Sequence, residues 1–398
     1  MTETLASQGG APVREKFLPY ALPLTGEDEK REMIAALESG WITTGPRTRK
    51  LEAALVEYTG AAHVVCVDSC TAALHLALAS LELQPGDEVI TTPITFCSTA
   101  NTIVHAGGKV VLADVSADTL NLDPAAVEKA ITPRTKALLP VHFGGHACDM
   151  DALLALAGKY DLRVIEDAAH AVGAKYRGRN IGTIGDAACF SFYATKNMTT
   201  AEGGALVTNR DDMAEFARLN SLHGMSKDAW KRYTSAGSWY YEVVSPGFKY
   251  NMTDLEAALG LHQLAKLDMF TGRRKELAAR FDAAFGDEAI LEIPRVRPEV
   301  DMVYHLYAIR LHLDKLTIDR ARFIEELKAE GIGTTVNFIP IHYHPYYREL
   351  LKLEKGALPV AEAAFDRLIS LPLYPRMTDA DADDVIAAVR KVAAAHAR

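Results

Sequence analysis

The stretch Phe190-Ser191-Phe192-Tyr193-Ala194-Thr195-Lys196-Asn197 decides the fold of this chain, because it runs from a strand-like segment directly into a lysine. Its first residues are aromatic, and the small-residue segment 199–204 follows the lysine. An acidic strand end, Ile165-Glu166-Asp167, lies upstream. Both polar groups therefore follow predicted strands, and ligands of α/β sheets collect at the carboxyl ends of the strands.

Short β-branched runs alternate with helical stretches from about residue 63 onward. The pattern predicts a helix over 71–81 and strands over 63–68, 88–91, 109–113, 136–141, 163–166, 188–192 and 205–208. Turn signals such as Gln84-Pro85-Gly86-Asp87 separate these runs. This alternation is typical of an α/β fold whose mostly parallel sheet is covered on both faces.

The pattern changes after Asp254, where 255–285 carries helical spacing without an inserted strand. We interpret this helix as the link to a smaller α+β domain, with strands predicted over 305–313 and 332–338 and helices over 320–330 and 380–395. The expected organisation is a loose N-terminal arm over 1–16, a large domain over 17–254, and the linking helix with the small C-terminal domain over 255–398.

Length and charge exclude several classes of protein. The 398 residues, 49% hydrophobic and 24% charged, exceed what one small core needs. The formal net charge of -9 comes from scattered acids, and no block of lysine or arginine could follow a phosphate backbone, so nucleic acid is not expected as a partner. Neither a signal peptide nor an apolar segment of spanning length is present, which predicts a cytoplasmic protein without membrane contact.

The five cysteines do not form a recognisable metal or disulfide pattern. Most have apolar neighbours and none is in a CxxC pair, so reduced and largely buried thiols are expected; they are Cys66, Cys70, Cys97, Cys148 and Cys189. The segment 342–348 contains two histidines two positions apart but no nearby carboxylate or cysteine ligand. We therefore expect no metal site there, and we interpret the segment as a mobile loop that covers a substrate.

The pairing of Lys196 with Asp167 predicts a particular cofactor. A lysine amine can hold an aldehyde as a Schiff base, and a buried acid can protonate the pyridine ring that carries the aldehyde. Small residues after Asp167 would let a flat ring approach the backbone, and desolvation would lower the pKa of Lys196. The pair indicates pyridoxal phosphate and an enzyme. The other interpretation is a surface lysine and a carboxylate that caps a helix.

The segment Asp68-Ser69-Cys70-Thr71 closes the first predicted strand and opens a helix. Backbone amides at a helix N-terminus, together with the Thr71 hydroxyl, suit the phosphate of such a cofactor. Taken alone, the segment is more typical of a simple helix cap formed by Ser69 or Thr71, because such caps are common.

From about residue 17 to residue 395 the chain resembles the sugar-nucleotide aminotransferases of the DegT/StrS type, which have the type I pyridoxal-phosphate fold. The segments that carry the resemblance are 40–46, 70–76, 164–170, 191–197 and 246–251. Residues 196–204 and 331–334 are most similar to the UDP-4-amino-4-deoxy-L-arabinose aminotransferases, whereas 337–342 differ.

The resemblance implies a catalytic role for three residues. Lys196 would be the Schiff-base lysine and the proton shuttle, Asp167 would pair with the pyridine nitrogen, and His170 would lie near the 3-oxygen of the ring. Phe96 would stack on the opposite ring face. Without the resemblance, Phe96 is more typical of a core residue.

The resemblance also implies phosphate and substrate contacts. Phosphate contacts would come from Cys70, Thr71, Ser191 and from Asn251 of a partner subunit, which implies a homodimer with composite active sites. Many relatives have glycine where Cys70 stands, so the loop here is expected to differ in shape. Alone, Asn251 is typical of a helix cap. Substrate contacts are expected from Trp41, Thr44 and His342.

The activity that the resemblance implies is transamination of a nucleotide-linked keto sugar with L-glutamate as the amino donor. The C4 ketone of a UDP-sugar is the first choice; a GDP- or dTDP-keto sugar aminated at C3 or C4 and an aminocyclitol ketone remain alternatives. Relatives that deoxygenate sugars have histidine in place of the lysine, so Lys196 argues against that reaction. A cofactor-binding regulatory protein is a further alternative, although residues 1–30 do not resemble a DNA-binding module.

Overall fold

The computed structural model describes residues 4–226 and 240–398. Its helices are α1 Glu27–Glu38, α2 Pro46–Thr59, α3 Cys70–Ala79, α4 Cys97–His105, α5 Pro124–Ala130, α6 Met150–Tyr160, α7 Asp211–Asn220, α8 Asp254–Ala265, α9 Leu267–Phe285, α10 Arg320–Ala329, α11 Pro345–Leu351, α12 Pro359–Phe365 and α13 Asp379–Ala395. Its strands are β1 His63–Val67, β2 Glu88–Thr91, β3 Lys109–Leu112, β4 Thr135–Leu139, β5 Arg163–Asp167, β6 Lys175–Tyr176, β7 Arg179–Asn180, β8 Ala187–Ser191, β9 Gly204–Thr208, β10 Leu291–Glu292, β11 Val300–Asp301, β12 Tyr307–Leu311 and β13 Leu368–Leu371.

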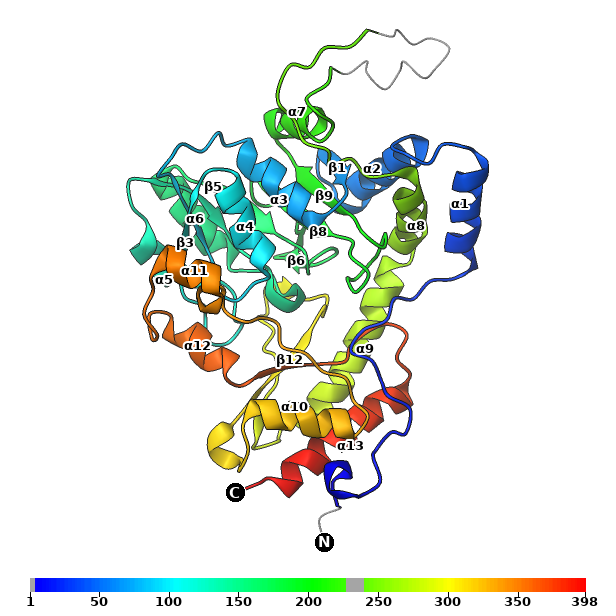
Figure 1. Ribbon diagram of the computed structural model, residues 1–398, viewed down its shortest axis with the longest axis vertical. Coiled ribbons are helices and arrows are strands. Elements are labelled where there is room, and N and C mark those ends of the chain that lie inside the picture. The colour runs from blue at the N-terminus through cyan, green and yellow to red at the C-terminus, as the bar shows by residue number, and fades with distance from the viewer. Residues whose placement is uncertain (1–3, 227–239) are drawn as a thin grey trace.

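A seven-stranded sheet in the order β1-β9-β8-β5-β4-β2-β3 organises the first half of the chain (Figure 1). Every pair from β8 to β3 is parallel, and only β9 runs antiparallel, to both β1 and β8. The mostly parallel sheet predicted from the sequence is therefore confirmed, and each of its seven strands was located to within two residues.

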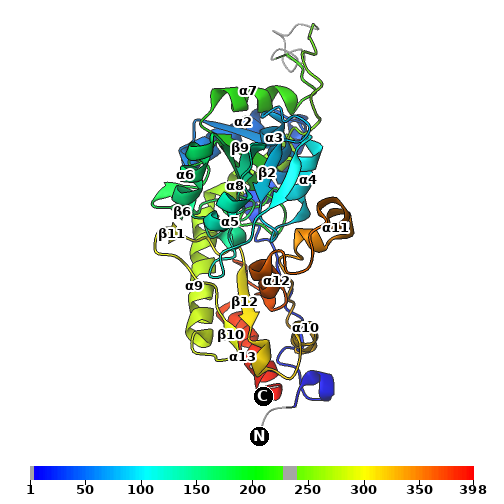
Figure 2. The ribbon, with the colours of Figure 1, turned by 90° about the vertical axis from the view of Figure 1, so that its left-hand side faces the viewer.

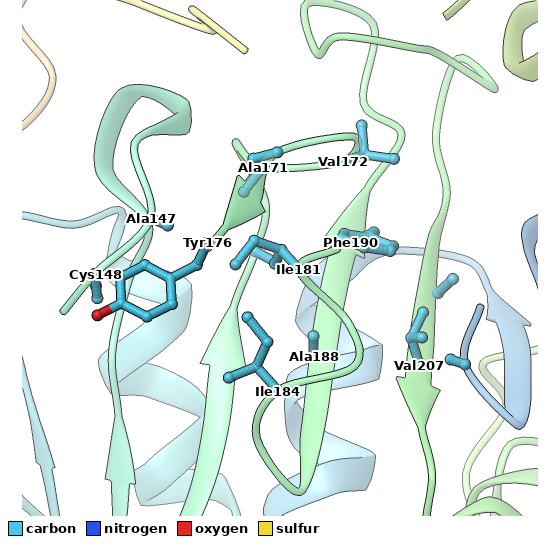
Figure 3. Close-up of a cluster of buried hydrophobic side chains, with 14 of the residues drawn as sticks. Ala147, Cys148, Ala171, Val172, Tyr176, Ile181, Ile184, Ala188, Phe190 and Val207 are labelled. Carbon is cyan, nitrogen blue, oxygen red and sulfur yellow. The ribbon is translucent and has the colours of Figure 1, made fainter. Parts of the chain in front are cut away.

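Successive residues of the central strands pack into two different cores, as expected for a sheet that is covered on both faces. In β9, Val207 packs in one buried cluster and Leu206 in the other. In β8, Phe190 packs in the same cluster as Val207, and Cys189 packs in the same cluster as Leu206. Figure 3 shows the first cluster, in which Phe190 is drawn between Val207 and Ile181, the latter from the turn that follows β7. The alternation explains why these strands read as continuous apolar runs.

The long helix predicted over 255–285 is two helices, α8 and α9, that meet at Lys266. The backbone of Lys266 leaves the helical range (φ -102°, ψ -2°), and its amine bonds to Glu29 Oε2 of α1 at 2.8 Å. Helix α9 then continues toward the part of the molecule that holds α10 and α13 (Figure 1). The break escaped prediction because an ion pair with a distant helix, rather than local sequence, accompanies it.

The C-terminal part of the chain forms a second sheet in the order β10-β12-β13, with α9 on one side of β12 and α10 and α12 on the other (Figure 2). The strand predicted over 305–313 corresponds to β12, but the strand predicted over 332–338 was wrong. That segment makes only single bridges, from Ile332 to Leu18 and from Thr335 to Ser370. It then leaves the sheet, because Asn337 and Phe338 turn into the wall of the cavity described below.

The described part of the N-terminal segment packs against the C-terminal part instead of forming a loose arm. Leu5 is fully buried, and the carboxylate of Glu330 accepts hydrogen bonds from the amides of Ala6 (2.9 Å) and Val13 (3.0 Å). The reason is Glu330 itself, which is buried and needs donors for both oxygens. Across the described residues, no helix is both long and apolar enough to span a membrane.

Candidate active site

A cavity of about 470 Å³ opens where the strands β1, β5 and β8 end. Its wall includes Ser69 after β1, Asp167 at the end of β5 and Ser191 at the end of β8. This is the sheet edge at which ligands of α/β folds bind. Seven of the predicted site residues line it together: Cys70, Thr71, Phe96, Asp167, His170, Ser191 and Lys196.

Lys196 lies in the cavity wall, in the turn that follows β8. Burial lowers its pKa to about 8, against the opposing influence of Cys70 and Asp167, which raise it. A lysine with this pKa has a substantial fraction of neutral, nucleophilic amine near neutral pH. The environment therefore suits attack on an aldehyde better than a solvated surface lysine would.

Asp167 is held by donors on both of its oxygens. Oδ2 accepts the Thr99 hydroxyl at 2.7 Å and Oδ1 accepts the Ala169 amide at 3.1 Å. Burial nevertheless raises the pKa of this carboxyl, although the two donors and the Lys196 amine lower it. A cationic group placed in the cavity would stabilise the carboxylate. A protonated pyridine nitrogen meets that need, so this residue fits the predicted cofactor.

The N-terminus of α3 forms the floor of the same cavity. Ser69 caps the helix, since its Oγ accepts the Ala72 amide at 3.1 Å, and Cys70 and Thr71 follow it into the cavity wall. Gly204 of β9 lies so close that a Cβ there would come within 2.4 Å of the Cys70 nitrogen. The cap predicted from sequence and the exposed first turn are thus both present, and the latter can hold a phosphate.

His170 is neutral and has a defined orientation. Burial, followed by the nearby Lys196 amine, keeps its pKa well below the usual range. Its Nδ1 accepts the Gly144 amide at 3.3 Å, which leaves the proton on Nε2. His170 can therefore donate one hydrogen bond to an oxygen of a bound ring.

His305 lines the cavity as well, although no motif or spacing in the sequence points to it. Its ring centroid lies 4.3 Å from that of His170, and its Nδ1 lies 3.0 Å from Asn197 Oδ1. Asn197 is the residue after Lys196, and its Nδ2 donates to the Val303 carbonyl at 3.2 Å. The segment before β12 is thereby tied to the turn that carries the lysine. Only the tertiary fold brings these two segments together.

Phe96 precedes α4 and remains 60% exposed, so it is not the core residue that its type alone suggests. Its ring centroid lies 6.1 Å from that of Phe338, which in turn lies 5.9 Å from His170. An exposed aromatic ring at the cavity mouth is available to stack on a flat ligand.

Three of the predicted residues gather outside this cavity. Asn251 Nδ2 donates to Thr44 Oγ1 at 2.6 Å, and Trp41 Nε1 donates to the Thr44 carbonyl at 2.9 Å. None of the three lines the cavity of its own chain. We refer to Trp41, Thr44 and Asn251 as the rim group.

His342 lies away from the cavity, and its segment is not a loop. Its side chain is buried and its Nε2 lies 3.3 Å from Glu362 Oε1. The residues 345–351 form helix α11, and the Ile341 amide bonds to the Pro93 carbonyl at 2.9 Å. The expectation that His342 contacts the substrate from a mobile loop is therefore not supported by its position, because the histidine is fixed by a buried carboxylate. The described residues contain no group of three or more potential metal ligands.

Comparison with known proteins gives a consistent result. The model of the DegT/DnrJ/EryC1/StrS aminotransferase family matches residues 23–390. The spore coat polysaccharide biosynthesis protein SpsC of Bacillus subtilis is 53% identical over 380 residues, which cover 95% of this chain and 98% of SpsC.

Two solved structures are similar along almost the whole chain. The putative sugar aminotransferase Spr1654 of Streptococcus pneumoniae, in its PMP-form, is 36% identical with a TM-score of 0.90, covering 95% of this chain and 99% of that chain. Helicobacter pylori PseC, an aminotransferase involved in the biosynthesis of pseudoaminic acid, is 31% identical with a TM-score of 0.89, covering 96% and 100%.

Proposed function

The chain belongs to the DegT/DnrJ/EryC1/StrS aminotransferase family, and we propose that it transfers the amino group of L-glutamate to the C4 ketone of a UDP-linked sugar. The coarser activity, pyridoxal-phosphate-dependent transamination of a sugar, follows from the family and from the PLP- and PMP-forms of a similar sugar aminotransferase. The observation that carries the cofactor-dependent transamination is the presence of Lys196 and Asp167 in one cavity beside the N-terminus of α3, and the UDP-linked 4-ketone and glutamate are our proposal for the substrates.

In the proposed arrangement, Lys196 holds the cofactor aldehyde and Asp167 its ring nitrogen. His170 donates from Nε2 to the ring oxygen, and the first turn of α3 with Ser191 binds the phosphate. When bound, pyridoxal phosphate supplies a carbonyl that accepts the amino group and a ring that withdraws electrons from the reacting carbon.

The residues of the chain would then do three things. Thr99 and the Ala169 amide orient the Asp167 carboxylate toward the ring. Once the amino group of the substrate has displaced it from the cofactor aldehyde, the free Lys196 amine, with its lowered pKa, would carry a proton between the carbon that bears the amino group and the aldehyde carbon of the cofactor. Phe96 covers the exposed ring face and excludes water.

We further propose that the protein works as a homodimer in the cytoplasm and that the rim group completes the cavity of the partner. Two observations support the dimer. The rim group lies outside the cavity of its own chain, although its residues match family segments. In addition, Ile34, Leu37 and Ile42 expose 53%, 57% and 49% of their surfaces on and just after α1, which is an apolar patch suited to a second copy.

A panel of UDP-, GDP- and dTDP-linked keto sugars, each incubated with the holoenzyme and glutamate and analysed by mass spectrometry, tests the substrate. We expect the mass shift of amination with the UDP-linked 4-ketone and release of 2-oxoglutarate. Preference for a GDP- or dTDP-linked ketone would show that UDP is the wrong nucleotide in our proposal. Reaction only with a free ketone such as inosose would show that the substrate is an aminocyclitol ketone and not a nucleotide sugar. If glutamate does not convert the bound pyridoxal phosphate to its amine form, glutamate is not the amino donor.

A further inference from the structure

Arg274 of α9 is a buried cation without an acidic partner among the described residues. Its side chain is 2% exposed, and its hydrogen bonds run from Nη1 to three main-chain oxygens, those of Leu373 (2.5 Å), Tyr304 (3.3 Å) and His305 (3.3 Å). Buried arginines are normally paired with a carboxylate. Here the carbonyls supply partial charge, but no carboxylate of the residues that the structure describes balances the guanidinium.

The guanidinium lies directly behind the wall of the active-site cavity. His305 and Leu373, whose carbonyls it binds, both line that cavity. Burial lowers the pKa of the guanidinium to about 10, and the charge of Tyr20, another lining residue, opposes this shift. Arg274 therefore remains protonated at neutral pH.

Polar capacity is left unused around this cation. Arg274 Nε is buried without a hydrogen-bond partner among the described residues, whereas the Ser370 hydroxyl interacts with the hydroxyl of Tyr20. Tyr20 itself reaches Asn337 Oδ1 at 3.1 Å. Native proteins leave few buried polar atoms unsatisfied, so this nitrogen, on a cation without an acidic partner among the described residues, points to an acceptor supplied by a ligand.

We propose that Arg274, together with the hydroxyls of Tyr20 and Ser370, forms the subsite that binds a carboxylate of the amino donor. This inference rests on the proposed function, since it requires an amino acid as the donor. A planar guanidinium matches a carboxylate in shape and charge. A nucleotide diphosphate is larger and carries more charge than one buried arginine with two hydroxyls can accommodate.

The three carbonyls explain how one cavity can serve both substrates. They hold the guanidinium while a sugar, which offers no carboxylate, occupies the cavity. When the donor is bound, its carboxylate acts as the counter-ion of Arg274 and accepts the Nε hydrogen, which none of the three carbonyls binds. His305 spans the two ends of this arrangement, since its carbonyl binds Arg274 while its ring contacts His170 and Asn197.

Arg274 could instead act only as a brace between the residues before β12 and after β13. The two roles differ in what they predict for ligands of different charge. A brace affects every ligand of the cavity equally, whereas a carboxylate subsite affects only anionic donors and their analogues.

The test uses the holoenzyme and the dicarboxylate glutarate, with the neutral glutaramide as its matched probe, in isothermal titration calorimetry. Arg274→Gln should weaken glutarate binding roughly 10- to 100-fold, the range expected for loss of a charge-assisted contact, and leave glutaramide unchanged. Arg273→Gln is the control, because Arg273 is adjacent on α9 but binds Asp379 and Glu276 at the surface. It should leave both affinities unchanged.

Equal losses for glutarate and glutaramide, or unchanged glutarate binding in folded Arg274→Gln, would overturn the proposal. Should Arg274→Gln not fold, Ser370→Ala and Tyr20→Phe keep the cation and remove one hydroxyl each. Each variant should then weaken glutarate binding, but not glutaramide binding, by a smaller factor than is expected for Arg274→Gln. Unchanged glutarate affinity in both variants would also overturn the proposal.

This experiment requires no sugar substrate and no turnover. If glutarate binding depends on Arg274 but none of the keto sugars is aminated, the proposed subsite stands and the proposed acceptor is refuted. Conversely, if the enzyme aminates a keto sugar but Arg274→Gln binds glutarate as tightly as the wild type, the proposed function stands and the proposed subsite is refuted.

Discussion

The Thr99 hydroxyl donates a hydrogen bond of 2.7 Å to Oδ2 of Asp167 inside the cavity wall. Thr99 Oγ1 also lies 2.7 Å from Thr95 Oγ1, and Thr95 lines the cavity. With Oδ1 engaged by the Ala169 amide, the carboxylate cannot rotate freely. The position of α4, which carries Thr99, thus determines the direction in which the key acid points.

Replacement of Thr99 with valine should weaken the affinity for pyridoxal phosphate by roughly tenfold, because one charge-assisted hydrogen bond contributes about 1.5–3 kcal/mol and only part of it depends on the cofactor. Thr99→Ser retains the hydroxyl and should bind nearly as the wild type. Titration of the apoprotein with cofactor, followed by absorbance, measures both. Equal affinities for the valine and serine variants would contradict the positioning role.

Replacement of Lys196 with alanine should abolish the covalent attachment of the cofactor. Borohydride reduction followed by mass spectrometry of peptides should find the cofactor on Lys196 in the wild type and on no peptide of the variant. Lys175→Ala, at an exposed position of β6, should behave as the wild type. If the visible absorbance band of the attached cofactor survives in Lys196→Ala without added amine, the lysine has been assigned wrongly.

The rate of cofactor attachment to the apoprotein should depend on pH through the Lys196 amine. Since its pKa is lowered to about 8 and the neutral form reacts, the rate should rise about tenfold per pH unit below 8 and level off above it. Free acetyl-lysine should show its midpoint near the reference value of about 10.4. Stopped-flow absorbance from pH 6 to pH 10 provides the measurement, and a protein midpoint near that of free lysine would refute the lowered pKa.

A heterodimer of Lys196→Ala and Asn251→Ala subunits should be active, although each parent homodimer is impaired. In the proposed composite site, the subunit with an intact lysine receives Asn251 from the other chain, which restores about one of the two sites. Co-expression with two affinity tags isolates the heterodimer for assay. A heterodimer no more active than its parents would place Asn251 in the cavity of its own chain or outside the site.

Glu29→Gln should lower the free energy of unfolding by roughly 1.5–3 kcal/mol at pH 7, because the buried carboxylate binds Lys266 and Gln263. Its pKa is lowered from 4.5 to about 2, so its contribution is present above pH 4.5 and is lost as the pH falls through about 2. Glu27→Gln, which breaks an exposed pair with Lys30, should leave the free energy of unfolding nearly unchanged.

Urea denaturation at pH 7 and at low pH measures the Glu29 and Glu27 variants. The difference between wild type and Glu29→Gln should shrink as the pH is lowered. A difference that stays constant down to pH 2 would show that the charge of Glu29 does not stabilise the junction of α1 with α8 and α9.

The strands of the main sheet could be located from the sequence because each is buried on both faces and therefore appears as an apolar run between turn signals. Residues 332–338 have the same appearance but form no strand, since Asn337 and Phe338 line the cavity instead of extending the pairing with Ser370. His342 was misplaced for a related reason. Its partner, Glu362, lies 20 residues further along the chain, so no local sequence pattern predicts their contact.

The sequence by itself determined the α/β fold and the meeting of Lys196, Asp167 and the 69–71 turn, because residues that end strands of the same direction lie at one edge of the sheet. The tertiary structure alone decided which groups surround them. Thr99, His305 and Arg274 reach the cavity or its wall through the packing of α4, the residues before β12 and α9. Such contacts depend on the burial of charge and on hydrogen bonds between distant segments, for which periodicity carries no information.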